Sequence, residues 1–73
     1  MSDVTMDPVR SSNVEAVGYD VERQVLVVRY RGGASYEYDG VSADERAEGL
    51  AADSVGGWLA RRIKPSKDCR RIA

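Results

Sequence analysis

The chain has 73 residues, of which 42% are apolar and 32% are charged, so it suits one small globular domain and leaves no room for a second. Its one cysteine, Cys69, excludes an internal disulfide. No stretch approaches the roughly 18 apolar residues of a membrane span, and the first dozen residues lack the apolar run of a signal peptide. We therefore expect a cytoplasmic protein with no membrane contact.

The net charge of −1 is unevenly distributed along the chain. Residues 1–60 sum to −6, whereas residues 61–73 sum to +5 through six cations, namely Arg61, Arg62, Lys64, Lys67, Arg70 and Arg71. A basic end of this kind attracts polyanions even on an acidic protein. The alternative interpretation is favourable charge at the end of a helix, followed by a solvated tail.

Three strands are predicted in the first half of the chain. Residues 1–10 are polar and contain Pro8, which predicts a flexible arm. Residues 14–19 and 25–30 are rich in β-branched side chains and form the first two strands. Glycines 32 and 33 then make a hairpin turn, and residues 34–38 form the third strand.

The length of the glycine loop decides which side chains share a face. A two-residue turn would put Ser35 and Glu37 beside the apolar side chains of the preceding strand. A three-residue loop with a glycine bulge instead groups five apolar or aromatic residues, namely Leu26, Val28, Tyr30, Tyr36 and Tyr38. Matching one apolar set with another is the better solution, because a slip of one residue sends the whole set to the wrong face. The sequence therefore predicts the bulged loop.

Two helices are predicted in the second half. Ser42 and Glu45 have the spacing of a capping box, which starts a helix over residues 43–51. A second helix begins at Asp53 or Ser54 and ends near Lys64, because proline follows at position 65. Its inward stripe comprises Val55, Trp58, Leu59, Arg62 and Ile63 at helical spacing.

These elements predict an α+β fold, a three-stranded antiparallel meander followed by two helices packed on one face. The domain covers residues 11–65, and residues 66–73 form a basic C-terminal tail.

Trp58 is expected to be the largest core residue, with Tyr36 or Tyr38 against it. If their face were open, the same tyrosines would form a platform for stacking bases; the need to cover the sheet favours the core. The opposite face carries an expected partner surface, namely Val25, Val27, Arg29 and Arg31.

The ordered set of these signals resembles the KTSC domain family. It consists of Ser11-Ser12-Asn13-Val14, Gly18-Tyr19-Asp20, Leu26-x-Val28-x-Tyr30, Tyr36-Glu37-Tyr38, Ser54-x-Gly56-x-Trp58-Leu59 and Ile63. The family is named for a domain at the C-terminus of some lysyl-tRNA synthetases and also occurs alone in bacterial and phage proteins. The resemblance implies the fold, a central Y-x-Y motif at Tyr36 and Tyr38, and a role in RNA binding.

The residues give little support to catalysis. The chain has no histidine, so the commonest general base near neutral pH is missing. One cysteine without a histidine is not an activated nucleophile, and no cluster has metal-ligand spacing. We therefore expect a non-enzymatic module without cofactor or metal. The leading expectation is RNA or tRNA binding through the six C-terminal cations; the alternative is interaction with a host or cellular protein, or self-association through the sheet.

Overall fold

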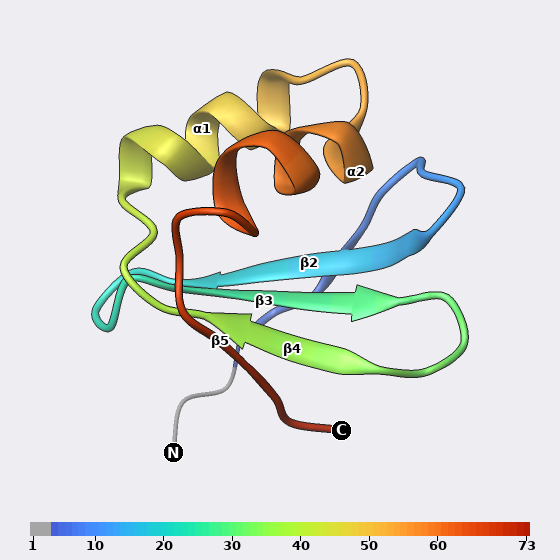
Figure 1. The fold of residues 1–73 in the computed structure, drawn as a ribbon, viewed down its shortest axis with the longest axis horizontal. Helices are drawn as coiled ribbons and strands as arrows, with labels where there is room; N and C mark the ends of the chain where they lie inside the picture. The colour runs from blue at the N-terminus through green and yellow to red at the C-terminus, as the bar shows by residue number, and fades with distance from the viewer. Residues whose placement is uncertain (1–3) are drawn as a thin grey trace.

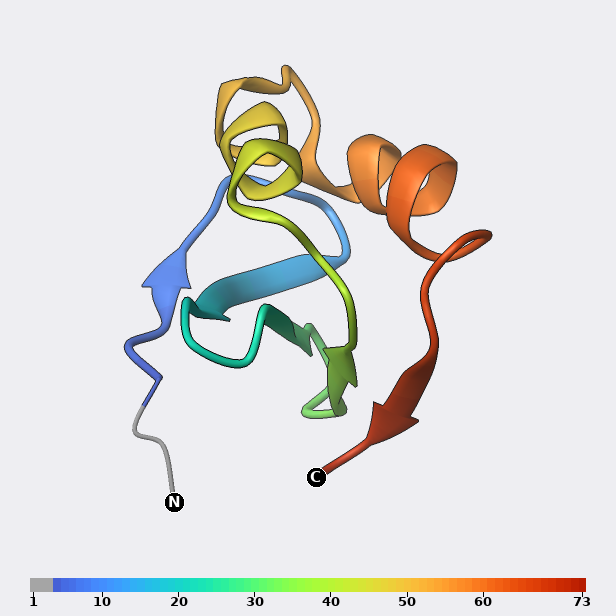
Figure 2. The ribbon, with the colours of Figure 1, turned by 90° about the vertical axis from the view of Figure 1, so that its left-hand side faces the viewer.

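A computed structural model describes residues 4–73 (Figure 1). The elements follow in the order β1 (Asp7–Pro8), β2 (Val14–Asp20), β3 (Val25–Tyr30), β4 (Ser35–Tyr38), α1 (Ala43–Ala51), α2 (Val55–Trp58), η1 (Leu59–Ile63) and β5 (Cys69–Arg71). The strands form one antiparallel sheet in the order β1-β2-β3-β4-β5. The helices cover one face of it, as the side view in Figure 2 shows.

The α+β class, the antiparallel meander and the two helices are confirmed, but the predicted number of three strands is wrong. Within residues 4–73 the sheet has five strands. β1 comes from the segment predicted to be a flexible arm, whose residues 1–3 lie outside the described part of the chain, and β5 comes from the predicted basic tail. Aspartate and proline, which make up β1, are depleted in strands, and the two edge strands have only two and three residues. Neither has a strand pattern of its own, and each is defined by its pairing with a neighbouring strand.

The bulged hairpin register is confirmed. Leu26 lies opposite Tyr38, and Val28 lies opposite Tyr36. Residues 31–33 form the loop, and both of its glycines have a positive φ, 104° and 100°, which glycine adopts without a steric penalty. The apolar set of β3 therefore faces the helices together with the tyrosines of β4.

Both helix starts are confirmed. Ser42 accepts from the Glu45 amide while the Glu45 carboxylate accepts from the Ser42 amide, and Ser54 caps α2 by accepting from the Gly57 amide. After Trp58 the second helix widens into the π-helical segment η1, and the Lys64 amide donates to Leu59 five residues back. Pro65 ends it at the predicted place.

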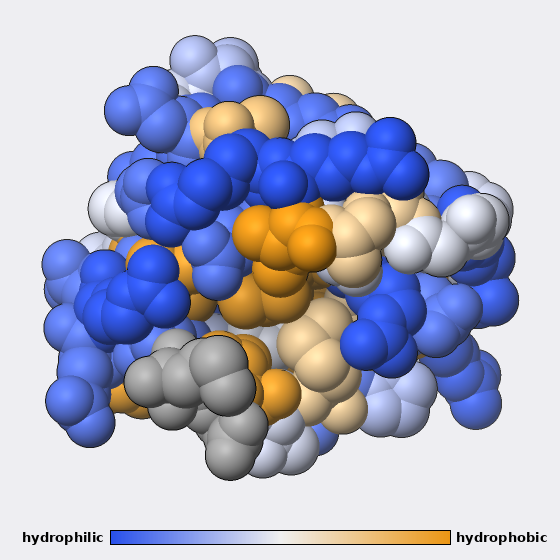
Figure 3. All heavy atoms as spheres, turned by 90° about the horizontal axis from the view of Figure 1, so that it is seen from below, coloured by the Kyte–Doolittle hydropathy of each residue, from blue (hydrophilic) through white to orange (hydrophobic). Residues whose placement is uncertain are grey.

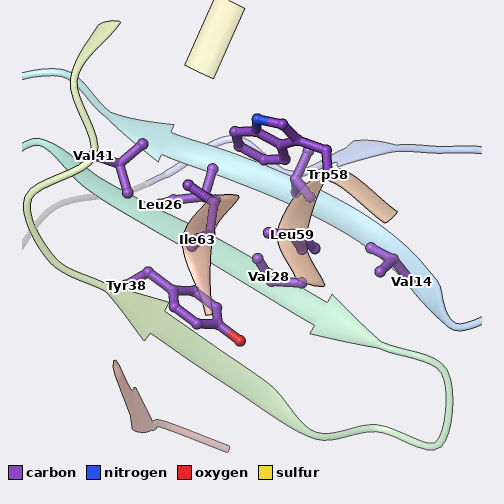
Figure 4. Packing of buried hydrophobic residues seen from close by; sticks show 9 residues of the cluster. Val14, Leu26, Val28, Tyr38, Val41, Trp58, Leu59 and Ile63 are labelled. Atoms are coloured by element: carbon purple, nitrogen blue, oxygen red, sulfur yellow. The ribbon is translucent and has the colours of Figure 1, made fainter. Parts of the chain in front are cut away.

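The core lies between the sheet and the helices (Figure 4). It consists of Val14, Val17, Leu26, Val28, Tyr38, Val41, Trp58, Leu59 and Ile63. Trp58 and Tyr38 are both 3% exposed, but Figure 4 places Tyr38 on β4 and Trp58 on the β2 side of the core. The expected pairing of a tyrosine with the indole is therefore wrong. Tyr36 is only half-buried, and Arg62 points outward, with 56% of its side chain exposed.

Trp58 packs instead against the bare backbone of α1. A Cβ atom at Gly49 would lie 2.6 Å from Cζ3 of the indole, closer than two carbons can approach. The indole nitrogen donates to Glu48 Oε1 at 3.1 Å, which satisfies its one polar atom. The glycine within α1 is therefore required by the ring beside it.

The expected partner surface on the opposite face is not open. Val25 is 3% exposed and Val27 is 8% exposed, whereas Arg29 and Arg31 are accessible. Residues 4–6 and 72–73 run beneath this face, and one groove is lined by residues that include Val4, Met6, Val27, Ile72 and Ala73. Figure 3 shows the resulting apolar strip among charged residues. Two apolar faces on one sheet both need cover, and the terminal segments cover the second.

Gly18 makes room for the N-terminal segment. A Cβ atom there would lie 2.5 Å from Cγ1 of Val4 and 2.7 Å from the sulfur of Met6. Residues 4–6 therefore cross directly beneath β2 and help to exclude water from the underside.

Gly49→Ala tests the contact with the indole. Alanine is favoured over glycine in a helix by about 1 kcal/mol, yet we expect the variant to lower the free energy of unfolding by about 1–3 kcal/mol because its methyl group overpacks against Trp58. Urea denaturation measures the change. Gly57→Ala is the control, because the atom nearest to a Cβ there is the movable Nη1 of Arg61 at 3.2 Å, and its contacts with Ser54, at 3.4 and 3.5 Å, are ordinary van der Waals distances. Equal stability changes at the two glycines would contradict this account.

Candidate nucleic-acid interface

The structure divides the six predicted cations into two groups. Three of them bind side-chain carboxylates of residues 1–60, which we call the acidic body, and the other three have no side-chain carboxylate within 4.0 Å among residues 4–73. The paired group is Arg62, Lys67 and Arg70, and the unpaired group is Arg61, Lys64 and Arg71. Only the second group can meet an external anion without first breaking an ion pair to a side-chain carboxylate. Within that group, Arg71 Nε donates to the Ala73 backbone oxygen at 2.9 Å, which leaves its terminal nitrogens for another acceptor.

Arg70 is the most heavily engaged of the paired cations. Its guanidinium donates to both carboxylate oxygens of Asp39, at 2.7 and 3.2 Å, and lies 2.9 Å from Glu37 Oε1. The hydrogen bonds from Arg70 lower the pKa of Asp39. A bidentate pair of this kind has specific geometry as well as charge, so Arg70 ties β5 to β4.

Lys67 and Arg62 form ion pairs with two glutamates of α1. Lys67 Nζ lies 2.9 Å from Glu45 Oε1 and donates to the Gly40 carbonyl at 2.8 Å. Arg62 Nε donates at 3.0 Å to Oε1 of Glu48, the oxygen that also accepts from the Trp58 indole. Both cations therefore contribute to the packing of the domain.

One of the unpaired cations, Lys64, lines a groove, and a second, Arg71, lies on the same face of the sheet as a tyrosine of that groove. Lys64 follows the last residue of η1, and its Nζ lies 5.2 Å from the centre of the Tyr30 ring, within cation–π range. Arg71 lies opposite Tyr36 in the β4–β5 pair, so its side chain leaves the sheet on the same face as that ring. Arg61 is exposed on η1.

The groove lies between the end of η1 and strands β4 and β5. It has a volume of about 490 Å³ and is lined by Tyr30, Ala34, Tyr36, Tyr38, Lys64 and Cys69. The rings of Tyr30 and Tyr36 meet edge-on, with centres 5.7 Å apart and planes at 78°. The hydroxyls of Tyr30 and Tyr38 form a hydrogen bond of 2.8 Å. Burial, aided by that bond, raises the pKa of the Tyr38 hydroxyl, so it stays protonated.

The two tyrosines of the Y-x-Y motif therefore have different environments. Both line the groove, but Tyr38 is 3% exposed, buried as predicted, whereas Tyr36 is half-buried. Sequence reasoning missed the groove because one of its sides is β5, which was predicted to be tail. Cys69-Arg70-Arg71 has no alternation of apolar and polar residues that would have marked it as a strand. In the structure Cys69 lines the groove, Arg71 lies on the same face of the sheet, and Arg70 faces Glu37 on the underside.

The groove brings together aromatic surface and a cation. Within residues 4–73 no three His, Cys, Asp or Glu side chains are grouped to hold a metal ion. None of the helices in this part of the chain is long and apolar enough to cross a bilayer. Cys69 is an exposed free thiol. Chemically, the site suits a planar ring with an anion attached.

Comparisons with known proteins agree with one another. The model of the KTSC domain family matches residues 10–66. A protein from Tsukamurella paurometabola is 43% identical over 60 residues, covering 82% of this chain and 90% of its own. An uncharacterized protein from Stutzerimonas stutzeri is 37% identical over 57 residues, covering 78% and 80%. The crystal structure of a KTSC domain protein from Yersinia pestis superposes with a TM-score of 0.90 at 30% identity, covering 97% of this chain and 100% of that one.

The paired cations lead to a prediction about pH. The hydrogen bond from the Ser42 amide, together with Lys67, lowers the pKa of Glu45 below its ordinary value of 4.5. A lowered pKa contributes stability that is present above pH 4.5 and is lost as the pH falls through the folded-state pKa. We expect Glu45→Gln to lower the free energy of unfolding by about 1 kcal/mol at pH 7, with the difference from wild type shrinking below pH 4.5.

Denaturant unfolding between pH 3 and 7 measures this difference. Glu22→Gln is the control, since Glu22 is an exposed acid in the turn after β2. A gap between wild type and Glu45→Gln that stays constant down to pH 3 would exclude the carboxylate as its source.

Proposed function

The chain belongs to the KTSC domain family, and from this premise we propose that it is a small non-enzymatic binding module that contacts RNA, tRNA included, through its C-terminal cations. The observation that carries the proposal is that Arg61, Lys64 and Arg71 have no side-chain carboxylate within 4.0 Å among residues 4–73. One of them, Lys64, lines an aromatic groove. Cations that already bind a carboxylate give little net energy to a second anion, because one contact replaces another.

The charge of the remainder of the protein limits how strong this binding is. The sequence has a pI of about 5.3, whereas nucleic-acid domains often have a pI above 9. Residues 1–60 carry a charge of −6, so an RNA is attracted by one side of the molecule and repelled by the rest. The proposal is therefore a local contact with few phosphates and a strong dependence on salt.

A salt titration of RNA binding tests the proposal. Three phosphate contacts to a single strand predict a slope of about −2 for log K against log salt concentration. We expect Arg61→Gln to reduce the magnitude of that slope by about 0.7. Arg62→Gln is the matched control from the next position, where the cation is already bound to Glu48, and it should leave the slope unchanged. Lack of binding to tRNA and to single-stranded RNA at about 50 mM salt would remove the proposal.

The rival proposal is a protein-interaction module that docks on a host or cellular protein or on a second copy. Val25 and Val27, which were expected to form its contact surface, are buried. The proposal therefore requires a different contact surface. The observation that favours it is the underside groove of about 270 Å³, at which Ile72 is 48% exposed. An exposed apolar strip of this kind is typical of contact surfaces.

Light scattering over a range of protein concentrations tests self-association. The rival proposal predicts a dimer that Ile72→Ser dissociates without changing the stability of the monomer. Val21→Ser is the control, because Val21 is 70% exposed in the turn after β2 and away from the strip. A monomer at every concentration would rule out self-association.

A further inference from the structure

We propose that the groove between η1, β4 and β5 holds one unpaired base of a single-stranded RNA against Tyr36, with an adjacent phosphate between Lys64 and Arg71. This rests on the proposed function and narrows it from RNA in general to an unstacked base. The size of the site fits, since its volume of about 490 Å³ lies within the roughly 300–1,000 Å³ of small-ligand sites.

The aromatic side of the groove is held in place before any ligand arrives. The Tyr30 hydroxyl is hydrogen-bonded to Tyr38 at 2.8 Å, and the Lys64 ammonium lies 5.2 Å from the centre of the Tyr30 ring. Tyr30 in turn meets Tyr36 edge-on. Tyr36 is therefore a half-buried ring supported by fixed neighbours, so stacking a base on it orders little that was mobile.

The charged groups favour an anion attached to the planar ring. Lys64 lines the groove, and Arg71 leaves β5 on the Tyr36 side. Neither has a side-chain carboxylate within 4.0 Å in the described part of the chain. Arg71 Nε donates to the Ala73 backbone oxygen at 2.9 Å, so the phosphate would be met by its Nη1 and Nη2 groups. A nucleotide supplies both a ring and a phosphate, and bases stack on aromatic side chains in single-stranded RNA readers. A duplex keeps its bases stacked inside, so it reaches the cations but not the groove.

Binding of short oligonucleotides, measured by fluorescence anisotropy, is the first test. We expect a single-stranded octanucleotide of RNA to bind at least about tenfold more tightly than a duplex of the same length. Tyr36→Leu should weaken single-strand binding by about tenfold, as loss of one stacked base does, while leaving the salt slope unchanged. Tyr19→Leu is the control, because it removes a ring from the same sheet face on β2, outside the groove.

The wild-type protein offers a second test that needs no substitution near the groove. Cys69 is the only cysteine, is exposed and lines the groove, so its thiol reports whether the groove is filled. Its rate of reaction with the neutral disulfide 4,4′-dithiodipyridine is followed by absorbance. We expect saturating single-stranded RNA to slow that reaction about fivefold or more, and the duplex to leave it nearly unchanged.

The results separate this inference from the proposed function. If RNA binds but single strand and duplex protect the Cys69 thiol equally, the contact is with phosphates alone, and the stacking site is overturned while RNA binding stands. The same holds if folded Tyr36→Leu binds like wild type. If neither RNA binds at about 50 mM salt, both fall, and a peptide or protein ligand becomes the better account of the groove.

Discussion

The indole of Trp58 lies against the backbone of Gly49, and this contact sets how closely the two helices approach. No side chain separates them at that point, because a Cβ atom on the glycine would lie 2.6 Å from the ring. Glu48 then secures the arrangement by accepting hydrogen bonds from the indole and from Arg62. The direction in which η1 leaves this junction decides where Lys64 lies over the sheet, so the groove depends on a contact between two helices at the far side of the core.

The helical layer is too small to cover the sheet completely. α1 has nine residues, and α2 with η1 adds nine more, above a sheet of five strands. Tyr38 lies opposite Leu26 and is covered, whereas Tyr36 lies opposite Val28, nearer the glycine hairpin, and stays half-buried. Neither a pure core role nor an open stacking platform describes the Y-x-Y motif. One ring stabilises the domain, and the next ring along the strand meets solvent.

Carboxylates of the acidic body, residues 1–60, form ion pairs with cations of residues 61–73 within the molecule itself. Arg70 binds Asp39 and Glu37, and Lys67 binds Glu45. Exposed ion pairs contribute little each, but together these attach β5 and the end of the second helix to the sheet and α1. A charge of +5 over residues 61–73 therefore overstates the cationic surface, because three of the six cations are bound to carboxylates of the molecule itself.

The sequence by itself determined the features that depend on neighbouring residues. The capping box at Ser42, the end of the helix before Pro65 and the register of β3 with β4 follow from local hydrogen bonding, backbone restriction and a period of two. Family membership was recognisable for the same reason, since its motifs sit on these elements. Tertiary structure alone decided that residues 7–8 and 69–71 become strands, that Val25 and Val27 are covered, and which cations stay unpaired. Each of those outcomes depends on segments that are distant in the chain, and their contacts leave no periodic pattern in the residues that make them.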